Sequence, residues 1–256
     1  MLTRFFSFLS FSLFSVFLYS DYSSDLDSIN STLQTNSIYA SSAPQQIQIY
    51  TDANSEMTIL LATMQGVSKD EIDNVKSSKS TGSIYASSAP QEQANNTEAF
   101  KDSLRLIAKI LDPNNEEIAK TDSSLASSEI YVNSALQQSA IRTLASFRFL
   151  KVIAEASGAD VQKVKEINST METNEIYVNS AYQQNANYSE AVAKILKEYA
   201  SAMGVEDEKL NPVISQMASR EIYVNSALQQ IVNYEMTSFE ILNLINNSFI
   251  NSNTIL

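Results

Sequence analysis

A nine-residue motif that returns at one fixed period constrains this chain more than any other feature. It first appears as IYASSAPQQ, and its copies begin at residues 38, 84, 130, 176 and 222, each 46 residues after the last. A period of this length without insertions indicates an array of small structural units. One such unit cannot bury its own apolar face, so neighbouring units are expected to stack on one another.

The period divides the chain into segments with stated bounds. We expect a signal peptide over 1–20 and an N-terminal cap or linker over 21–37. Complete repeats then cover 38–83, 84–129, 130–175 and 176–221, and 222–256 holds a partial fifth repeat with a C-terminal tail.

The sequence between the motifs favours helices. Val192, Ile195 and Tyr199 recur at the spacing of one helical face, and the other repeats show the same pattern. The whole chain holds only four Gly and four Pro, so few residues interrupt a long helix. Alanines repeat in two columns, which suggests that a neighbouring helix approaches closely there. These columns are Ala53, Ala99, Ala145 and Ala191, and Ala62, Ala108, Ala154 and Ala200.

Helix start and stop signals recur with the motif. Each copy contains Ser-Ala-x-Gln, the spacing at which a serine hydroxyl caps a helix and the glutamine reaches back. The predicted capping serines are Ser42, Ser88, Ser134, Ser180 and Ser226. Pro44 and Pro90 fall in the first turn, and Gly66, Gly158 and Gly204 share a column where a left-handed C-terminal cap would end the long helix.

The unit is therefore predicted as a long helix, a turn, a second and shorter helix, and an extended Ile-Tyr-Val or Ile-Tyr-Ala connector. This order predicts an all-α protein of tandem two-helix repeats, stacked as an α-solenoid or an elongated helical bundle. The alternative is a βαα solenoid, in which the connectors pair as short parallel strands.

The motif itself allows two interpretations. The first places its Ile and Tyr between repeats as packing residues, because repeat consensus residues usually record packing between units. The second places the tyrosines on one surface, flanked by asparagines, where flat rings and amides suit protein or carbohydrate binding. The residues concerned are Tyr39, Tyr85, Tyr131, Tyr177, Tyr223, Asn133, Asn179 and Asn225. A further column, Tyr50, Tyr188 and Tyr234, either extends such a surface or belongs to the core.

The N-terminus predicts export. Arg4 precedes an uncharged apolar run over 5–19, which is shorter than a membrane-spanning helix needs. We expect a secreted or cell-surface protein. The alternative is an uncleaved membrane anchor, and a membrane is expected as a partner only in that case.

Composition argues against catalysis. The chain has no His or Cys, which removes Ser-His and Cys-His nucleophile pairs and the usual zinc and transition-metal ligands. No Gly-rich phosphate loop or Ca²⁺-loop pattern is present, so we expect no enzyme, no cofactor and no metal. The formal charge of −12 argues against nucleic acid as a partner.

Two functions remain. The first is a structural, self-assembling role, with the chain itself as the partner in a homo-oligomer or filament. The second is a multivalent binding module, such as an adhesin or secreted effector, that uses the Tyr and Asn residues to bind a surface protein or a glycan.

Overall fold

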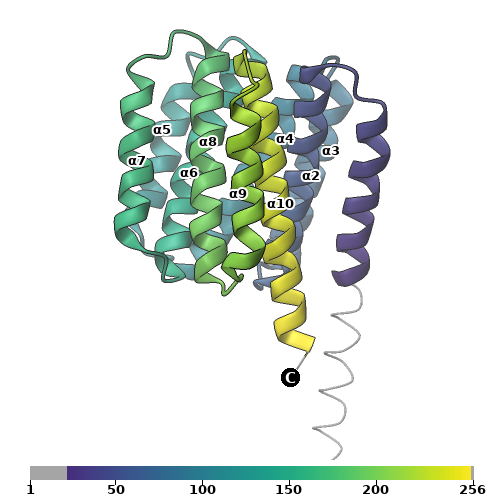
Figure 1. Ribbon diagram of the computed structural model, residues 1–256, viewed down its shortest axis with the longest axis vertical. Coiled ribbons are helices and arrows are strands. Elements are labelled where there is room, and N and C mark those ends of the chain that lie inside the picture. Colours follow the sequence, from purple (N-terminus) through teal and green to yellow (C-terminus); the bar gives the residue numbers. More distant parts are fainter. Residues whose placement is uncertain (1–21, 255–256) are drawn as a thin grey trace, which may run out of the picture.

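The structure, a computed structural model, describes residues 22–254 and is 84% helical (Figure 1). Long and short helices alternate after a helix over residues 22–38. The long helices are α2 (Ala43–Met64), α4 (Ala89–Leu111), α6 (Ala135–Ala156), α8 (Ala181–Ala202) and α10 (Ala227–Thr254). The short helices are α3 (Lys69–Tyr85), α5 (Glu116–Glu129), α7 (Val161–Glu175) and α9 (Asp207–Glu221). The predicted signal peptide lies outside the described residues.

The five long helices of residues 22–254 form a closed ring. Each packs against the next in the order α2, α4, α6, α8 and α10, and α10 packs back against α2. The short helices lie outside this ring, and each packs mainly against the long helix that follows it. The burial pattern agrees, because α7 buries only Val164 and Met171, whereas eleven residues of α6 are buried.

The predicted all-α class and tandem two-helix organisation are confirmed, and the structure adds that the array closes on itself. The described residues contain no strand, so the βαα alternative is wrong. The Ile-Tyr-Val connectors cannot pair as strands because they form turns at one end of the ring. The backbone N–H of Tyr131, for instance, donates to the Ser128 carbonyl at 3.1 Å.

The helix over residues 22–38 is the outer helix of the first unit. Leu26 is 3% exposed and holds the same position, at 46-residue spacing, as one buried residue in each short helix. Those residues are Ile72, Ile118, Val164 and Leu210. Counted from its outer helices, the ring therefore contains five complete helix pairs, and the sequence repeat simply begins inside a unit, at the connector.

Ring closure coincides with two departures from the repeat in the last unit. Asn246 replaces the alanine that the earlier units have at this position, in the column that begins with Ala62. Its Nδ2 donates to the Met57 carbonyl on α2 at 3.2 Å. Glu235 stands where they have Thr or Ser, and its Oε2 accepts from Asn54 Nδ2 at 2.8 Å. Both bonds join α10 to α2, so the polar residues at this seam favour closure over an open array.

The long helices α2, α6 and α8 end as predicted at glycines. Gly66, Gly158 and Gly204 have φ values of +88°, +90° and +80°. After α2 the Gly66 N–H donates to the Thr63 carbonyl and the Val67 N–H to the Ala62 carbonyl, each at 3.1 Å, so the helix closes with a glycine cap.

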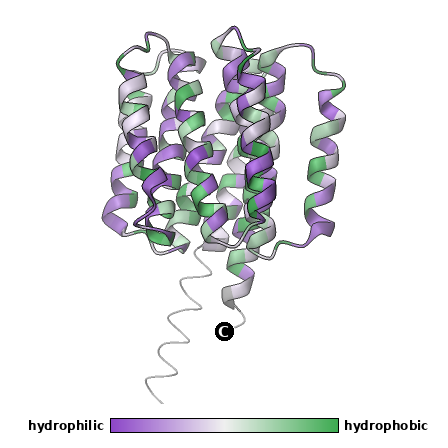
Figure 2. Ribbon diagram, turned by 90° about the vertical axis from the view of Figure 1, so that its left-hand side faces the viewer, coloured by the Kyte–Doolittle hydropathy of each residue, from purple (hydrophilic) through white to green (hydrophobic). Residues whose placement is uncertain are grey.

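The core follows the helical pattern of the sequence. Both predicted alanine columns are buried, with exposures of 5% or less. Figure 2 shows hydrophobic and hydrophilic residues interleaved along the helices, as expected for helices with one buried face. The largest fully buried side chains, including Phe147, Phe149 and Tyr199, lie on the long helices.

Candidate interaction surface

The Ile-Tyr pairs of the motif are the most exposed large hydrophobic residues of the described chain. Their exposures lie between 76% and 81%. They occur at the C-terminal ends of the outer helices or in the connectors that follow, all at the upper end of the ring in Figure 1. We call this set the Ile-Tyr crown, and it comprises Ile38, Tyr39, Ile84, Tyr85, Ile130, Tyr131, Ile176, Tyr177, Ile222 and Tyr223.

The interpretation of Ile and Tyr as packing residues between repeats is therefore wrong. The long helices pack directly against one another, and their own side chains fill the space between units. The connectors lie beyond the ends of these helices, where no neighbouring element covers them. Within the connector only the following residue turns inward, since Val132, Val178 and Val224 are partly buried.

The capping prediction is confirmed for three of the five serines. The hydroxyl oxygens of Ser134, Ser180 and Ser226 accept from the third backbone N–H of their helices, each at 3.3 Å. Ser42 and Ser88 occupy the same position, but their side chains do not cap. Their hydroxyls donate to Gln45 and Gln91 at 3.2 and 3.3 Å, and the three capping serines donate to their own glutamines in the same way, at 3.2–3.5 Å.

The first two units also differ from the later three in the groups around the glutamine. In the first two units, Ser41 and Ser87 each donate to the capping glutamine through both the backbone N–H and the hydroxyl. The later units have Asn at that position, which lacks the hydroxyl. The glutamine oxygen therefore accepts from three donors in each of the first two units and from two in each later unit.

The predicted asparagines lie beside the tyrosines. Asn133, Asn179 and Asn225 are exposed, and their backbone N–H groups donate to the capping glutamines at 3.1–3.3 Å. The backbone at these positions is thus fixed while the side chains face solvent. The structure places the Tyr and Asn residues of the motif on the same end of the ring.

The second tyrosine column does not extend this surface. Tyr188 is 4% exposed and its hydroxyl donates to Glu175 Oε1 at 2.5 Å. Burial, followed by that bond, raises the pKa of Tyr188. Tyr234 is 5% exposed, and Tyr50 packs edge-on against Phe239 with ring centres 6.4 Å apart. These tyrosines belong to the core.

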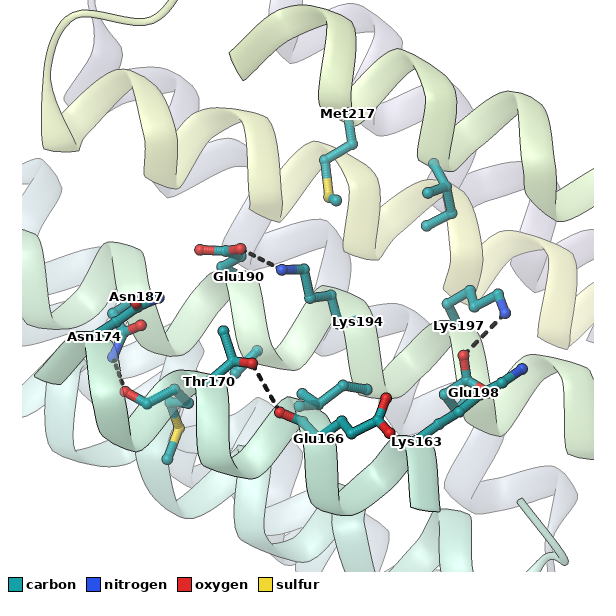
Figure 3. A pocket seen from close by; sticks show the side chains of 14 residues that line it. Lys163, Glu166, Thr170, Asn174, Asn187, Glu190, Lys194, Lys197, Glu198 and Met217 are labelled. Atoms are coloured by element: carbon teal, nitrogen blue, oxygen red, sulfur yellow. Dashed lines mark hydrogen bonds and ion pairs between the residues drawn. The ribbon is translucent and has the colours of Figure 1, made fainter. Parts of the chain in front are cut away.

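A groove of about 450 Å³ lies on the outside of the ring, between α7 and α9 over α8 (Figure 3). Its charges neutralise one another, because Lys194 pairs with Glu190 at 2.5 Å and Lys197 with Glu198 at 2.9 Å. Asn187 closes one side by donating from Nδ2 to the Met171 carbonyl at 2.9 Å. The paired charges select no particular ligand.

A second polar feature, not predicted from the sequence, lies inside the ring. Glu235 and four hydroxyl residues occupy one column of the repeat: Thr51, Thr97, Thr143, Ser189 and Glu235. The 46-residue alignment could have found it, since Glu235 is the one charged residue of that column.

Comparisons with family models, curated proteins and solved structures found no match. Among residues 22–254, no helix is both long and apolar enough to cross a membrane. The same part of the chain has no group of three or more Asp, Glu, His or Cys residues that could hold a metal.

Proposed function

We propose that this is a secreted or cell-surface protein without catalytic activity, whose Ile-Tyr crown mediates self-assembly. One observation carries the proposal: ten large apolar residues stand at equivalent positions in five units, each at least 76% exposed. Exposed apolar side chains in this number at one end of a molecule favour an interaction site there. Secretion is supported by the apolar run after Arg4, and a non-catalytic role by the absence of His and Cys.

Charge favours a second copy of the chain as the partner. The protein carries a formal charge of −12, so most faces of two copies repel each other. The five nine-residue motifs contain one charged residue, Glu92. In two later units the glutamate that precedes the motif interacts with the inner helix that follows. Glu129 forms an ion pair with Arg142, and Glu175 accepts a hydrogen bond from the Tyr188 hydroxyl.

The available area is sufficient for a stable contact. A tyrosine buries roughly 150–250 Å² in an interface, so five tyrosines that are about four-fifths exposed offer roughly 600–1,000 Å² per copy. A standard interface buries about 800 Å² per partner. Because both copies present the same surface, a crown-to-crown dimer with a two-fold axis satisfies the geometry.

Ring closure restricts other modes of assembly. An open array could grow by stacking its first unit on the last unit of another copy. Here α10 already packs against α2 of the same chain, so that face is occupied. Assembly then depends on the ends or the outside of the ring.

Sedimentation velocity over a range of concentrations tests the proposal. Wild-type protein should form dimers, and the triple variant Tyr131→Ser, Tyr177→Ser, Tyr223→Ser should remain monomeric. Val161→Ser is the matched control, because Val161 is an exposed apolar residue, 49% exposed, away from the crown. This control should dimerise like the wild type.

A wild-type protein that stays monomeric at hundreds of micromolar contradicts self-assembly. The second candidate function, multivalent binding of a glycan or surface protein, rests on the exposed Asn133, Asn179 and Asn225 beside the tyrosines. In that case the monomeric wild type should bind cells or glycan arrays, and the triple tyrosine variant should lose this binding while retaining its helix content.

A further inference from the structure

The centre of the ring contains a small void to which all five long helices contribute. Its walls are formed by Thr51, Asn54, Thr97, Phe100, Thr143, Val192 and Glu235. Its volume is about 10 Å³, counted as the space in which the centre of a water molecule can move. This is enough for one water molecule or one ion of similar size. The Glu235 side chain keeps partial exposure although protein surrounds its carboxyl group, as expected for a group that faces an internal void.

The threonine hydroxyls present oxygen to this void and not hydrogen. Thr97 donates to the Gln93 carbonyl at 2.8 Å, and Thr143 donates to the Ser139 carbonyl at 2.9 Å or to Asn185 Oδ1 at 3.0 Å. Thr51 donates to the Gln48 carbonyl at 3.0 Å. A hydroxyl has one hydrogen and two lone pairs, so each of these groups is left only with acceptor capacity.

Asn54 and Glu235 add further acceptors. Asn54 Nδ2 donates both to the Glu235 backbone carbonyl at 3.1 Å and to its Oε2 at 2.8 Å, which fixes the orientation of the amide. The other amide atom, Asn54 Oδ1, is buried without a hydrogen-bond partner. Ser189 donates its own hydrogen to Glu235 Oε1 at 3.0 Å.

Oxygen acceptors and one carboxyl group thus line most of the void, and the apolar side chains of Phe100 and Val192 line the rest. Asn54 Oδ1 is the one acceptor of this set without a partner, and one water molecule, which can donate two hydrogen bonds, reaches it and one further oxygen. A cation can instead be coordinated by the lone pairs of the amide, hydroxyl and carboxyl oxygens together, and its charge compensates the carboxylate. Oxygen ligands are those that hard cations prefer.

We propose that the void is a binding site for one small monovalent cation, held by the Glu235 carboxylate, Asn54 Oδ1 and the hydroxyl oxygens of Thr51, Thr97 and Thr143. The site contains one carboxylate, whose single negative charge is balanced by a monovalent cation. A divalent ion such as Mg²⁺ gives up its water reluctantly and normally binds with more anionic oxygen. The sequence-based expectation of no metal rested on missing His, Cys and Ca²⁺-loop patterns, and this site uses none of them.

The site has a structural consequence. Its ligands come from α2, α4, α6 and α10, so the ion joins helices on both sides of the α2–α10 seam. A bound cation therefore stabilises the closed ring, and this effect does not depend on the Ile-Tyr crown.

Thermal unfolding of the full chain tests the proposal in NaCl, KCl, NH₄Cl and tetramethylammonium chloride at equal concentration and pH. The last cation is too large for the void. We expect a midpoint about 4 °C higher in at least one small-cation salt, the shift for a ligand at ten times its dissociation constant. Glu235→Gln should remove this difference, and Thr97→Val should reduce it.

Glu240→Gln is the matched control, because Glu240 lies on the same helix but pairs with Arg220 at 3.3 Å, away from the void. It should keep the cation dependence. Equal midpoints in all four salts, or an unchanged cation dependence in Glu235→Gln, overturn the proposal. If Glu235→Gln does not fold, wild-type crystals grown in RbCl decide: an anomalous peak between the five long helices supports the site, and no peak there refutes it.

Discussion

Removing tyrosines from the Ile-Tyr crown should leave the fold almost as stable as before. Tyr131, Tyr177 and Tyr223 are 81%, 76% and 81% exposed, so about one-fifth of each side chain is buried. Full burial of a large apolar side chain stabilises by about 1.5–3 kcal/mol, and one-fifth of this is about 0.3–0.6 kcal/mol. The triple alanine variant should therefore lose about 1–2 kcal/mol of unfolding free energy.

A packing role predicts a very different result. Truncation of a buried aromatic residue to alanine costs about 3–5 kcal/mol, so three of them would remove about 9–15 kcal/mol, as much as a whole domain's stability. Urea unfolding followed by circular dichroism at 222 nm separates the two cases. Tyr199→Ala is the control, because Tyr199 is 1% exposed and its loss alone should cost about 3–5 kcal/mol. A loss above about 3 kcal/mol in the crown variant would refute the exposed placement.

Three further changes test the ring itself. Burial raises the pKa of the Glu235 carboxyl, against the hydrogen bonds from Asn54 and Ser189, which lower it. Folded protein therefore retains this proton after the unfolded chain has lost it, and stability present at acidic pH is lost as pH rises through the folded pKa. In tetramethylammonium buffer, the unfolding free energy of Glu235→Gln should rise relative to that of the wild type as pH increases. The rise should be about 1.4 kcal/mol per pH unit between the unfolded and the folded pKa of Glu235, measured by urea unfolding at several pH values. Gly158→Ala should lose about 1–2 kcal/mol in the same assay at one pH, because alanine at a φ of +90° is strained. Asn246→Ala should cost about 1–2 kcal/mol and increase hydrogen exchange first along the α2–α10 seam, since the bond to the Met57 carbonyl is lost; exchange spread evenly over the ring would contradict a local role.

The helical unit could be predicted from sequence because its signals are local. The spacing of Val192, Ile195 and Tyr199 and the glycine caps depend on residues within a few turns. Ring closure could not be predicted in this way, because it depends on how much each unit rotates relative to the next. The sequence carried a clue only in Asn246 and Glu235, which break their columns in the last unit.

The packing interpretation of the motif was wrong for a related reason, whereas the exposed-surface interpretation agrees with the burial of these residues. Ile-Tyr is apolar, and apolar repeat residues usually pack between units. The Ile-Tyr pair follows the last buried position of its outer helix, so no neighbouring helix covers it. Whether the pair is covered depends on the length of that outer helix. The first outer helix was expected only as a cap or linker because it precedes the first copy of the motif, although Leu26, Ser31 and Thr35 align at the 46-residue spacing with Ile72, Ser77 and Thr81.

Distance measurements between single spin labels test the central claim that copies of this ring associate through the Ile-Tyr crown. The chain has no Cys, so Asn179→Cys places a label beside the crown, and Asn114→Cys places one in the connector at the opposite end. Double electron–electron resonance should then give a defined distance between copies from the crown label, shorter than the distance from the opposite end. A shorter distance from Asn114→Cys, or no coupling between copies from either label at high concentration, would contradict it.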